Sequence, residues 1–353
     1  MKKIGEMGFF SVMVIMNTTT TNEISGPNES APFRILSLCG GGLNGSFSAG
    51  VLSQIEYATG EKIVDHFDLI VGTSTGGIIA LGLGLGLPPD MLVRFYSEKG
   101  TKIFNQPSMG GFFSWAKSLR RVKYNENALV SELRQVLGDR LLGESQIPLV
   151  IPSFDLERNE VRLFKTRHNP RFEFDHRIAA WKVARATSAA PTYLPACRDI
   201  AGAQLIDGGV WANNPIMVGL TEAMSEFKVM PGSIRILSLG TTTPVKRFRP
   251  SLDRAGISKW APRISETLIQ AQSSGSLGQA RLLAGKENII HIDPLVADGE
   301  FKLDKSKPET LECLAEHHAR HSMSEIRRTF FSESASTGRM VLQNLNGGIS
   351  HVA

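Results

Sequence analysis

The strongest restriction on the fold comes from two short apolar runs, each followed directly by a glycine-rich turn and then by a helical pattern. Residues 33–38 lead into GGG at 40–42, and residues 67–71 lead into GTSTG at 72–76. Apolar runs of this length are typical of buried strands, and glycine allows the tight turn that joins a strand to a helix. Helical patterns follow at residues 47–57 and 76–83. The repeated order of strand, turn and helix predicts an α/β fold with parallel strands.

The rest of the chain continues this alternation. Further strands are predicted at residues 149–154, 161–165, 204–206, 234–239 and 289–292, and further helices at 88–100, 127–137, 178–187, 216–227, 264–283 and 309–328. The stretch 17–30 is polar and rich in Thr, Asn and Ser, so residues 1–32 are predicted to be a flexible lead-in. We predict one domain over residues 33–330 and a C-terminal tail over residues 331–353.

Composition places the chain among folded globular proteins. Of its 353 residues, 42% are hydrophobic and 21% are charged, which argues against disorder. The net charge of +5 favours contact with anionic surfaces such as lipid headgroups or a nucleotide. This charge is too weak to indicate binding to duplex nucleic acid, and no zinc-finger or helix-turn-helix pattern accompanies it.

The N-terminus and the cysteines point to the cytoplasm, with export as the alternative. Lys2 and Lys3 precede an apolar run as in a signal peptide, but Glu6 interrupts that run and no small-residue cleavage pattern follows. No window reaches the ~18 uninterrupted apolar residues of a transmembrane helix. The cysteines at positions 39, 197 and 313 are far apart, so no disulfide framework or metal motif is expected, and each is predicted to be buried.

Ser74 lies at the centre of G-x-S-x-G, between a predicted strand and a predicted helix. In this context the motif forms a nucleophile elbow, a sharp turn that lifts the serine hydroxyl off the sheet. The helix that follows supplies unpaired N–H groups and the positive end of its dipole. The alternative is an ordinary Gly/Ser/Thr turn, and the placement between strand and helix favours the nucleophile.

The loop after the first strand offers backbone amides to a negative charge. Gly40, Gly42 and Gly45 fit the dinucleotide pattern G-x-G-x-x-G, but that fold needs an acidic residue at the end of the second strand, where this sequence has the elbow. A phosphate-binding P-loop would need a lysine that this loop does not have. We therefore predict that Gly40, Gly41 and Gly42 form an oxyanion hole, and we expect no cofactor.

Asp207 begins the tripeptide Asp-Gly-Gly at the end of a predicted strand. Its carboxylate can project into a cleft there and act as a general base, although the same tripeptide is common in Asx-type turns. A second mechanism adds His291, because Ser74, Asp207 and His291 follow the chain order of α/β-hydrolase triads. The histidines at positions 317, 318 and 321 have helical spacing; a polar helix face is favoured over a metal site, so no metal is expected.

Taken in order, these motifs resemble those of the patatin-like phospholipase family. The family pattern is a glycine-rich oxyanion loop, then G-x-S-x-G, then Asp-Gly-Gly or Asp-Gly-Ala. Two further blocks match, ARATSAAPTYLP at residues 184–195 and WANNP at residues 211–215, and the resemblance covers residues 33–325. It implies an α/β sandwich with a largely parallel central sheet flanked by helices. It also implies hydrolysis of fatty-acyl esters of phospholipids by a dyad of Ser74 and Asp207 in place of a triad.

The glycine-rich loop departs from the family pattern at two positions. The family usually has Asp before the loop and Arg or Lys before its last glycine, where this sequence has Cys39 and Asn44. The amides of Gly41 and Gly42 remain, so an oxyanion hole can form, but a nearby cationic side chain is lost. A weakly active, lipid-binding regulatory protein is therefore an alternative, against which the retained serine and aspartate argue.

Within the family, the size of the chain and the character of residues 301–331 resemble bacterial effector phospholipases of anti-phage CBASS systems. This resemblance implies a cytoplasmic enzyme that a cyclic dinucleotide activates and that then acts peripherally at the inner membrane. Arg247 and Arg249 are candidate contacts for the phosphates of such a ligand, and a homo-oligomer could supply part of the switch. The alternative is a constitutive lipid acyl hydrolase without nucleotide control.

Residues 105–125 form a basic and aromatic insertion that is predicted to be a loop. Its basic and aromatic members include Phe112, Phe113, Trp115, Arg120, Arg121 and Lys123. We expect the aromatic rings to enter a lipid interface while the basic groups meet anionic headgroups. The alternative is a surface loop whose aromatic residues pack onto the domain.

Overall fold

The computed structural model describes residues 31–100, 103, 122–245, 250–301, 304, 307–332, 341–343 and 345. The described residues from Pro32 onward belong to one compact unit. Most of the predicted lead-in lies outside the described residues, as do Arg247, Arg249 and every named side chain of the basic and aromatic insertion except Lys123. The domain limits at residues 33 and 330 stay predictions.

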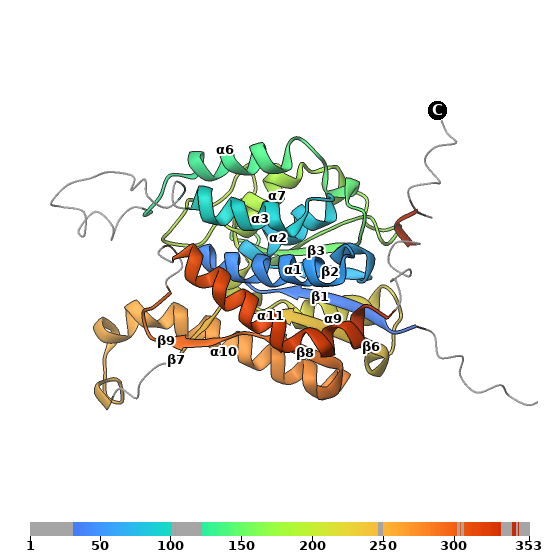
Figure 1. Cartoon of the computed structure of the whole chain (residues 1–353). Helices are drawn as coiled ribbons and strands as arrows, with labels where there is room; N and C mark the ends of the chain where they lie inside the picture. Colours follow the sequence, from blue (N-terminus) through green and yellow to red (C-terminus); the bar gives the residue numbers. More distant parts are fainter. Residues whose placement is uncertain are drawn as a thin grey trace, which may run out of the picture. The chain divides into compact units, whose positions relative to one another are not determined.

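A sheet of seven strands forms the middle layer of this unit (Figure 1). Its strands are β1 (Phe33–Leu38), β2 (Leu69–Gly72), β3 (Leu149–Asp155), β4 (Glu160–Lys165), β5 (Leu205–Asp207), β6 (Ile234–Leu239) and β8 (Ile289–Ile292). Their order is β4-β3-β2-β1-β6-β8, and β5 pairs with β3. β3, β2, β1, β6 and β8 run parallel, whereas β4 and β5 run antiparallel to β3. A separate parallel pair joins β7 (Thr243–Val245) to β9 (Leu295–Ala297).

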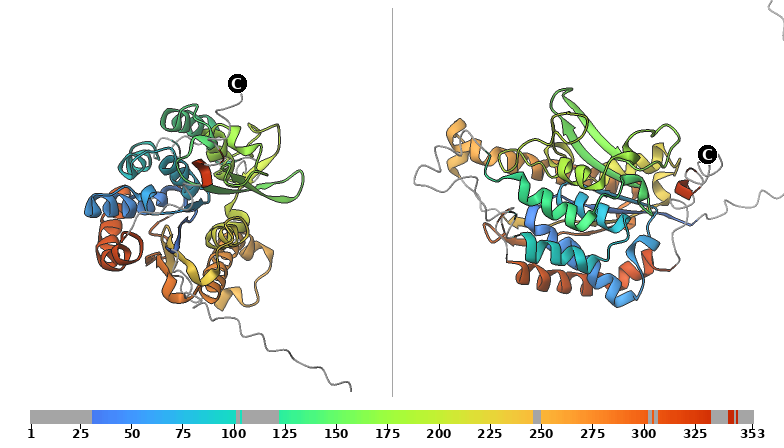
Figure 2. Two further views of the ribbon diagram at one scale, coloured as in Figure 1. Left: turned by 90° about the vertical axis from the view of Figure 1, so that its right-hand side faces the viewer. Right: turned by 90° about the horizontal axis from the view of Figure 1, so that it is seen from above.

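Helices cover both faces of the sheet (Figure 2). One side carries α1 (Gly45–Thr59), α2 (Thr75–Gly84), α3 (Pro89–Arg94), α6 (Glu126–Leu137), α7 (Ala180–Thr187) and α11 (Pro308–Phe330). The other side carries α8 (Gly209–Ala212), α9 (Ile216–Ser225) and α10 (Ile257–Ala284). Successive strand residues point to opposite faces, so Leu36 and Leu38 of β1 join the first core, and Phe33 and Ile35 join the second. The predicted α/β sandwich with a largely parallel sheet is confirmed.

Three details of the helices bear on the sequence predictions. α10 begins at Ile257, earlier than the predicted residue 264. Cys39 and Cys197 are buried as predicted, but Cys313 is exposed. Leu311 and Ala315 mark the buried face of α11, and Cys313 is two residues from each, which places it on the opposite side of the helix. None of the helices in the described part of the chain has the length and apolar character needed to cross a membrane.

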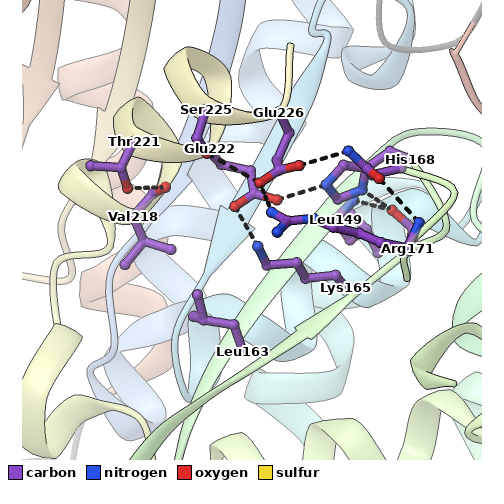
Figure 3. A network of polar contacts seen from close by, with 12 residues as sticks. Leu149, Leu163, Lys165, His168, Arg171, Val218, Thr221, Glu222, Ser225 and Glu226 are labelled. Carbon is purple, nitrogen blue, oxygen red and sulfur yellow. Dashed lines mark hydrogen bonds and ion pairs between the residues drawn. The ribbon is translucent and has the colours of Figure 1, made fainter. Parts of the chain in front are cut away.

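A buried network of charged groups fixes α9 against the β4 edge of the sheet (Figure 3). One oxygen of Glu222 on α9 accepts a hydrogen bond from Lys165 Nζ at 2.6 Å, and the other lies 2.8 Å from His168 Nε2. Nearby, Glu226 pairs with Arg171. Burial opposes the ionised form of Glu222, but the hydrogen bonds from His168 and Lys165 outweigh it and hold the pKa of the carboxyl below its usual value. Because α9 begins directly after the WANNP block, the network also holds that block in place.

Glu222→Ala is expected to lower the free energy of unfolding by about 3–5 kcal/mol, because it leaves the largely buried cation of Lys165 without its partner. The matched control is Asp90→Ala, which removes an ion pair with Arg94 whose two side chains are more than half exposed. Such a pair contributes less than ~1 kcal/mol. Urea denaturation followed by circular dichroism measures both variants. An equal loss of stability in the two would contradict the structural role of the buried network.

Candidate active site

Ser74 occupies the turn between β2 and α2, with φ of 55° and ψ of −121°. Positive φ is uncommon for a residue with a side chain, and a strained strand-to-helix turn of this kind is the geometry of a nucleophile elbow. The Ser74 N–H donates to Thr187 Oγ1 at 2.9 Å, and Thr187 Oγ1 donates to the Pro152 carbonyl at 2.5 Å. A buried hydroxyl on α7 therefore helps to hold the elbow.

Close packing requires the glycines of G-x-S-x-G. A Cβ on Gly72 would lie 2.2 Å from the Gly76 carbonyl oxygen, and a Cβ on Gly76 would lie 2.3 Å from the Leu38 carbonyl oxygen. Both distances are well inside van der Waals contact, so a side chain at either position would displace the backbone. The glycines thus let α2 begin directly beside the end of β1, where the glycine-rich loop starts.

Asp207 ends β5 and contacts the serine hydroxyl. Ser74 Oγ donates to Asp207 Oδ2 at 2.7 Å, and the Gly209 N–H donates to Asp207 Oδ1 at 2.7 Å. The structure thus brings the two residues of the predicted dyad into contact, while their catalytic roles stay predictions. Burial raises the pKa of Asp207 to about 6, although the hydrogen bonds from Gly209 and Ser74 lower it in part. At neutral pH the carboxylate is mostly ionised.

The antiparallel course of β5 explains this contact. β2 pairs with the first part of β3, where Val71 lies beside Val150, and β5 pairs with the later part, where Asp207 lies beside Ser153. β2 ends at the elbow, and beyond that point β5 is the strand that pairs with β3 on the same side. β5 runs in the opposite direction to β2, so its chain heads toward the end of β2. Its last residue, Asp207, therefore ends against the turn that carries Ser74.

The glycine-rich loop lies beside Ser74. A Cβ on Gly40 would be only 3.2 Å from Ser74 Cβ, so the two segments approach closely. Gly41 precedes a short 3₁₀ turn that Gly42 begins, and among the described residues neither N–H has a hydrogen-bond partner. The N–H of Thr75, at the start of α2, has no partner within its helix. Free amides beside a serine hydroxyl can stabilise an oxyanion.

Gly40 has a different role from the one predicted. Its N–H donates to the Asn213 carbonyl at 3.0 Å. The prediction that Gly40 is an oxyanion donor does not agree with this structure, because a backbone hydrogen bond already satisfies its amide. A Cβ at this position would meet Asn213 Oδ1 at 2.6 Å, so the residue contributes through its small size.

Three residues without a predicted role hold the site together. Thr187 binds the elbow, and its own carbonyl accepts a hydrogen bond from the Gly208 N–H at 3.3 Å. Asn213 fixes the Gly40 amide, and Thr241 Oγ1 donates to the Gly40 carbonyl at 3.1 Å. Thr187 and Asn213 lie within the blocks ARATSAAPTYLP and WANNP, whose match to a family pattern was the available signal. Thr241 carried no such signal.

The two positions at which the loop departs from the family pattern bring no charge to the site. Cys39 is buried; desolvation, with the nearby charge of Asp293, raises the pKa of its thiol well above the usual value. Asn44 is buried and neutral. Stabilisation of an oxyanion here would therefore have to come from backbone amides and from the dipole of α2.

Two candidate residues lie elsewhere. His291 is on the edge strand β8, where its Nδ1 is 3.1 Å from Ser238 Oγ, and β6 and β1 separate β8 from β2. At ~4.8 Å per strand, His291 is too far from Ser74 to complete a triad. Lys123, which was predicted to meet lipid headgroups, forms an ion pair with the buried carboxylate of Asp304. Its contact with lipid stays a prediction.

The fold and the site together match the class of α/β hydrolytic enzymes in which a serine turn follows the second strand of a largely parallel sheet. Residues 36–220 match the family model described as patatin-like phospholipase, and the chain belongs to this family. The family predicted from the motifs is thus confirmed.

Three curated relatives carry the name cGAMP-activated phospholipase. The one from Pseudomonas aeruginosa is 32% identical and aligns with 83% of this chain and 90% of its own length. The one from Vibrio cholerae is 31% identical, over 80% of this chain and 88% of its own. The one from Escherichia coli is 36% identical, over 62% of this chain and 65% of its own. Among solved structures, VipD from Legionella pneumophila aligns with 84% of this chain and 67% of its own, with a TM-score of 0.43 and 12% identity.

Proposed function

We propose that this chain hydrolyses fatty-acyl esters of membrane phospholipids through a dyad of Ser74 and Asp207. One observation carries the proposal: the 2.7 Å hydrogen bond from Ser74 Oγ to a buried carboxylate. Membership of the patatin-like phospholipase family supports the same chemistry.

The reaction divides into acylation and deacylation. Ser74 Oγ attacks the ester carbonyl carbon while its proton passes to Asp207 Oδ2, and the carbonyl oxygen becomes an oxyanion. The tetrahedral intermediate collapses when the alcohol leaves with that proton, which gives acyl-Ser74. Water then attacks the acyl group and gives a proton to Asp207. The second collapse returns this proton to Ser74 Oγ and releases the fatty acid.

The burial of Asp207 makes a dyad chemically reasonable. An exposed aspartate, with a pKa of ~3.9, is a weak base for a hydroxyl. Desolvation raises the pKa of Asp207 to about 6, close to the ~6.5 of the histidine that serves in a triad. The amides of Gly41 and Gly42 would supply the remaining stabilisation of the transition state by hydrogen bonding to the oxyanion.

The rate is expected to depend on pH through Asp207. Because burial raises its pKa to about 6, the carboxyl is protonated below that pH and cannot accept the serine proton. kcat/KM should therefore fall about tenfold per pH unit on the acid side and level off above pH 6. Initial rates with a water-soluble short-chain ester, taken from about pH 3 to about pH 8, measure the midpoint. A midpoint near ~3.9 would contradict a desolvated base.

We further propose that a cyclic dinucleotide activates hydrolysis, which then serves anti-phage defence at the inner face of the membrane. Two relatives named cGAMP-activated phospholipase align with 83% and 80% of this chain and support this proposal. An unregulated phospholipase in the cytoplasm would attack the membrane of its own cell, so a control step is physically sensible. To raise the active population from ~1% to ~99%, the ligand must prefer the active state by about 5.5 kcal/mol, part of which a homo-oligomer could supply.

Fatty-acid release from phospholipid vesicles, with and without a panel of cyclic dinucleotides and trinucleotides, tests both proposals. The expected result is low basal release and roughly 100-fold stimulation by a cyclic dinucleotide. The Ser74→Ala chain with the same ligand controls for contaminating lipase. Full release without ligand, unchanged by every member of the panel, would reject the switch and leave hydrolysis standing. No release by the folded chain under any of these conditions would reject hydrolysis itself.

A further inference from the structure

Thr241 lies beside the glycine-rich loop because the two segments follow neighbouring parallel strands. Leu38 at the end of β1 pairs with Leu239 at the end of β6. Gly40 and Thr241 each come two residues after these partners, so they leave the sheet at the same edge. Thr241 Oγ1 donates to the Gly40 carbonyl at 3.1 Å, and both residues are buried. The side chain of one segment thus holds the backbone of the other.

This hydrogen bond fixes the orientation of the peptide that joins Gly40 to Gly41. In a planar trans peptide the C=O and the N–H point in opposite directions. With the carbonyl held at Thr241, the Gly41 N–H points away from that side chain, and it has no hydrogen-bond partner among the described residues. Turned over, the same peptide would present its carbonyl oxygen where the N–H now lies, and that oxygen would repel an oxyanion.

The loop has a particular need for such a contact. A peptide between two glycines turns over readily, because neither residue has a Cβ to restrict its backbone. Another residue at position 41 is not compatible with the packing, since a Cβ on Gly41 would lie 2.0 Å from Thr241 Oγ1. Thr241 therefore requires a glycine at this position and also supplies the hydrogen bond that limits its freedom.

Asp293, directly after β8, shapes the turn that presents Thr241. Its Oδ1 accepts a hydrogen bond from the Thr242 N–H at 2.9 Å, and its Oδ2 accepts one from the Thr243 hydroxyl at 2.5 Å. Thr242 has a φ of 105°, which a β-branched residue rarely adopts. Such a conformation persists only where the surrounding contacts impose it. The two hydrogen bonds to Asp293 thus fix the backbone directly after Thr241.

We propose that Thr241 is a positioning residue for the oxyanion hole, and that it holds the Gly40–Gly41 peptide so that the Gly41 N–H stays available to the oxyanion. Asp293 supports it by holding the turn. Both residues act through the backbone and not on the substrate. The proposal rests on the proposed function and deepens it, because the oxyanion forms when Ser74 attacks the ester.

Thr241→Val tests the hydrogen bond, because valine keeps the shape of threonine and lacks the hydroxyl. With a water-soluble short-chain ester, a misdirected N–H should lower kcat about ten- to 100-fold. KM should change less than about threefold, because the oxyanion exists only after Ser74 has attacked. Thr241→Ser retains the hydroxyl and should keep kcat within about threefold of the unsubstituted chain.

Thr221→Val is the matched control for this substitution. Thr221 is exposed on α9, and its hydroxyl donates to the Met217 carbonyl of the same helix at 2.8 Å. This variant should hydrolyse the ester as the unsubstituted chain does. Circular dichroism at the assay temperature shows that all variants are folded.

Asp293→Ala tests the route through Thr241, because it removes both acceptors that hold the turn. It should lower kcat about threefold or more in the unsubstituted chain. When Thr241 is already valine, the hydrogen bond that the turn supports is lost, so the same substitution should lower kcat by less than about 1.5-fold. Equal losses in the two backgrounds would show that Asp293 does not act through Thr241.

A fluorophosphonate gives a readout that does not need ester hydrolysis. Ser74 Oγ forms a bond to phosphorus, fluoride leaves and the serine proton passes to Asp207, while the phosphoryl oxygen takes the place of the oxyanion. Thr241→Val should slow the rate of this labelling about tenfold or more, and Thr241→Ser should leave it within about threefold.

Hydrolysis and labelling by Thr241→Val at the rates of the unsubstituted chain would overturn the proposal and leave hydrolysis standing. An equal loss of kcat in Thr241→Val and Thr241→Ser would also overturn it, because the serine variant retains the hydroxyl. If the unsubstituted chain released no fatty acid but reacted with the fluorophosphonate, and Thr241→Val slowed that reaction, the result would refute the proposed function and support the positioning role.

Discussion

Ser74→Ala is expected to lower fatty-acid release by about 10⁴-fold or more, because it removes the atom that attacks the ester. The fold should persist. The hydroxyl of Ser74 donates to Asp207 and packs into no core, and alanine meets the same steric conditions as serine at a φ of 55°. Release from phospholipid vesicles, measured at equal protein concentrations with the activating ligand present, gives the ratio.

Ser274→Ala is the matched control for this substitution. Ser274 is exposed on α10, and its hydroxyl donates to Ala271 of the same helix at 3.1 Å. This variant should release fatty acid as the unsubstituted chain does. A fluorophosphonate probe should label the chain and the Ser274→Ala variant but not Ser74→Ala. Substantial hydrolysis by a folded Ser74→Ala protein would show that Ser74 is not the nucleophile.

Asp207→Asn is expected to lower kcat by about 10³- to 10⁴-fold. The amide oxygen can still accept the Gly209 N–H, so the turn keeps its shape, but the side chain can no longer take the proton of Ser74 Oγ. Because substrate is bound by other groups, KM should change much less than kcat. Steady-state rates with a soluble ester separate the two constants.

His291→Ala decides between the dyad and the triad. With the imidazole on β8 beside Ser238, its removal should change kcat less than about threefold. If His291→Ala abolished hydrolysis while Asp207→Asn retained it, the base would be the histidine and the site would have to rearrange before it acts.

Much of the secondary structure could be predicted, because its signals are local. β1 and β6 occupy the residues predicted for them, since each is a short apolar run between polar or glycine-rich segments. Gly72 and Gly76 indicated an elbow because the steric need for glycine there arises within a few residues. The start of α10 was missed, because much of its surface faces away from the core and its pattern is not that of a packed helix.

The sequence by itself determined the α/β class, the family and the two residues of the candidate dyad, because contiguous motifs and local periodicity carry that information. Only the tertiary structure decided which groups meet. Ser74 and Asp207 are 133 positions apart and come together because β5 runs antiparallel along β3 into the place that β2 leaves. The same packing buries Asp207 and raises its pKa to about 6, and it commits the Gly40 amide to Asn213. Strand pairing and burial depend on segments far apart in the chain, so no local pattern encodes them.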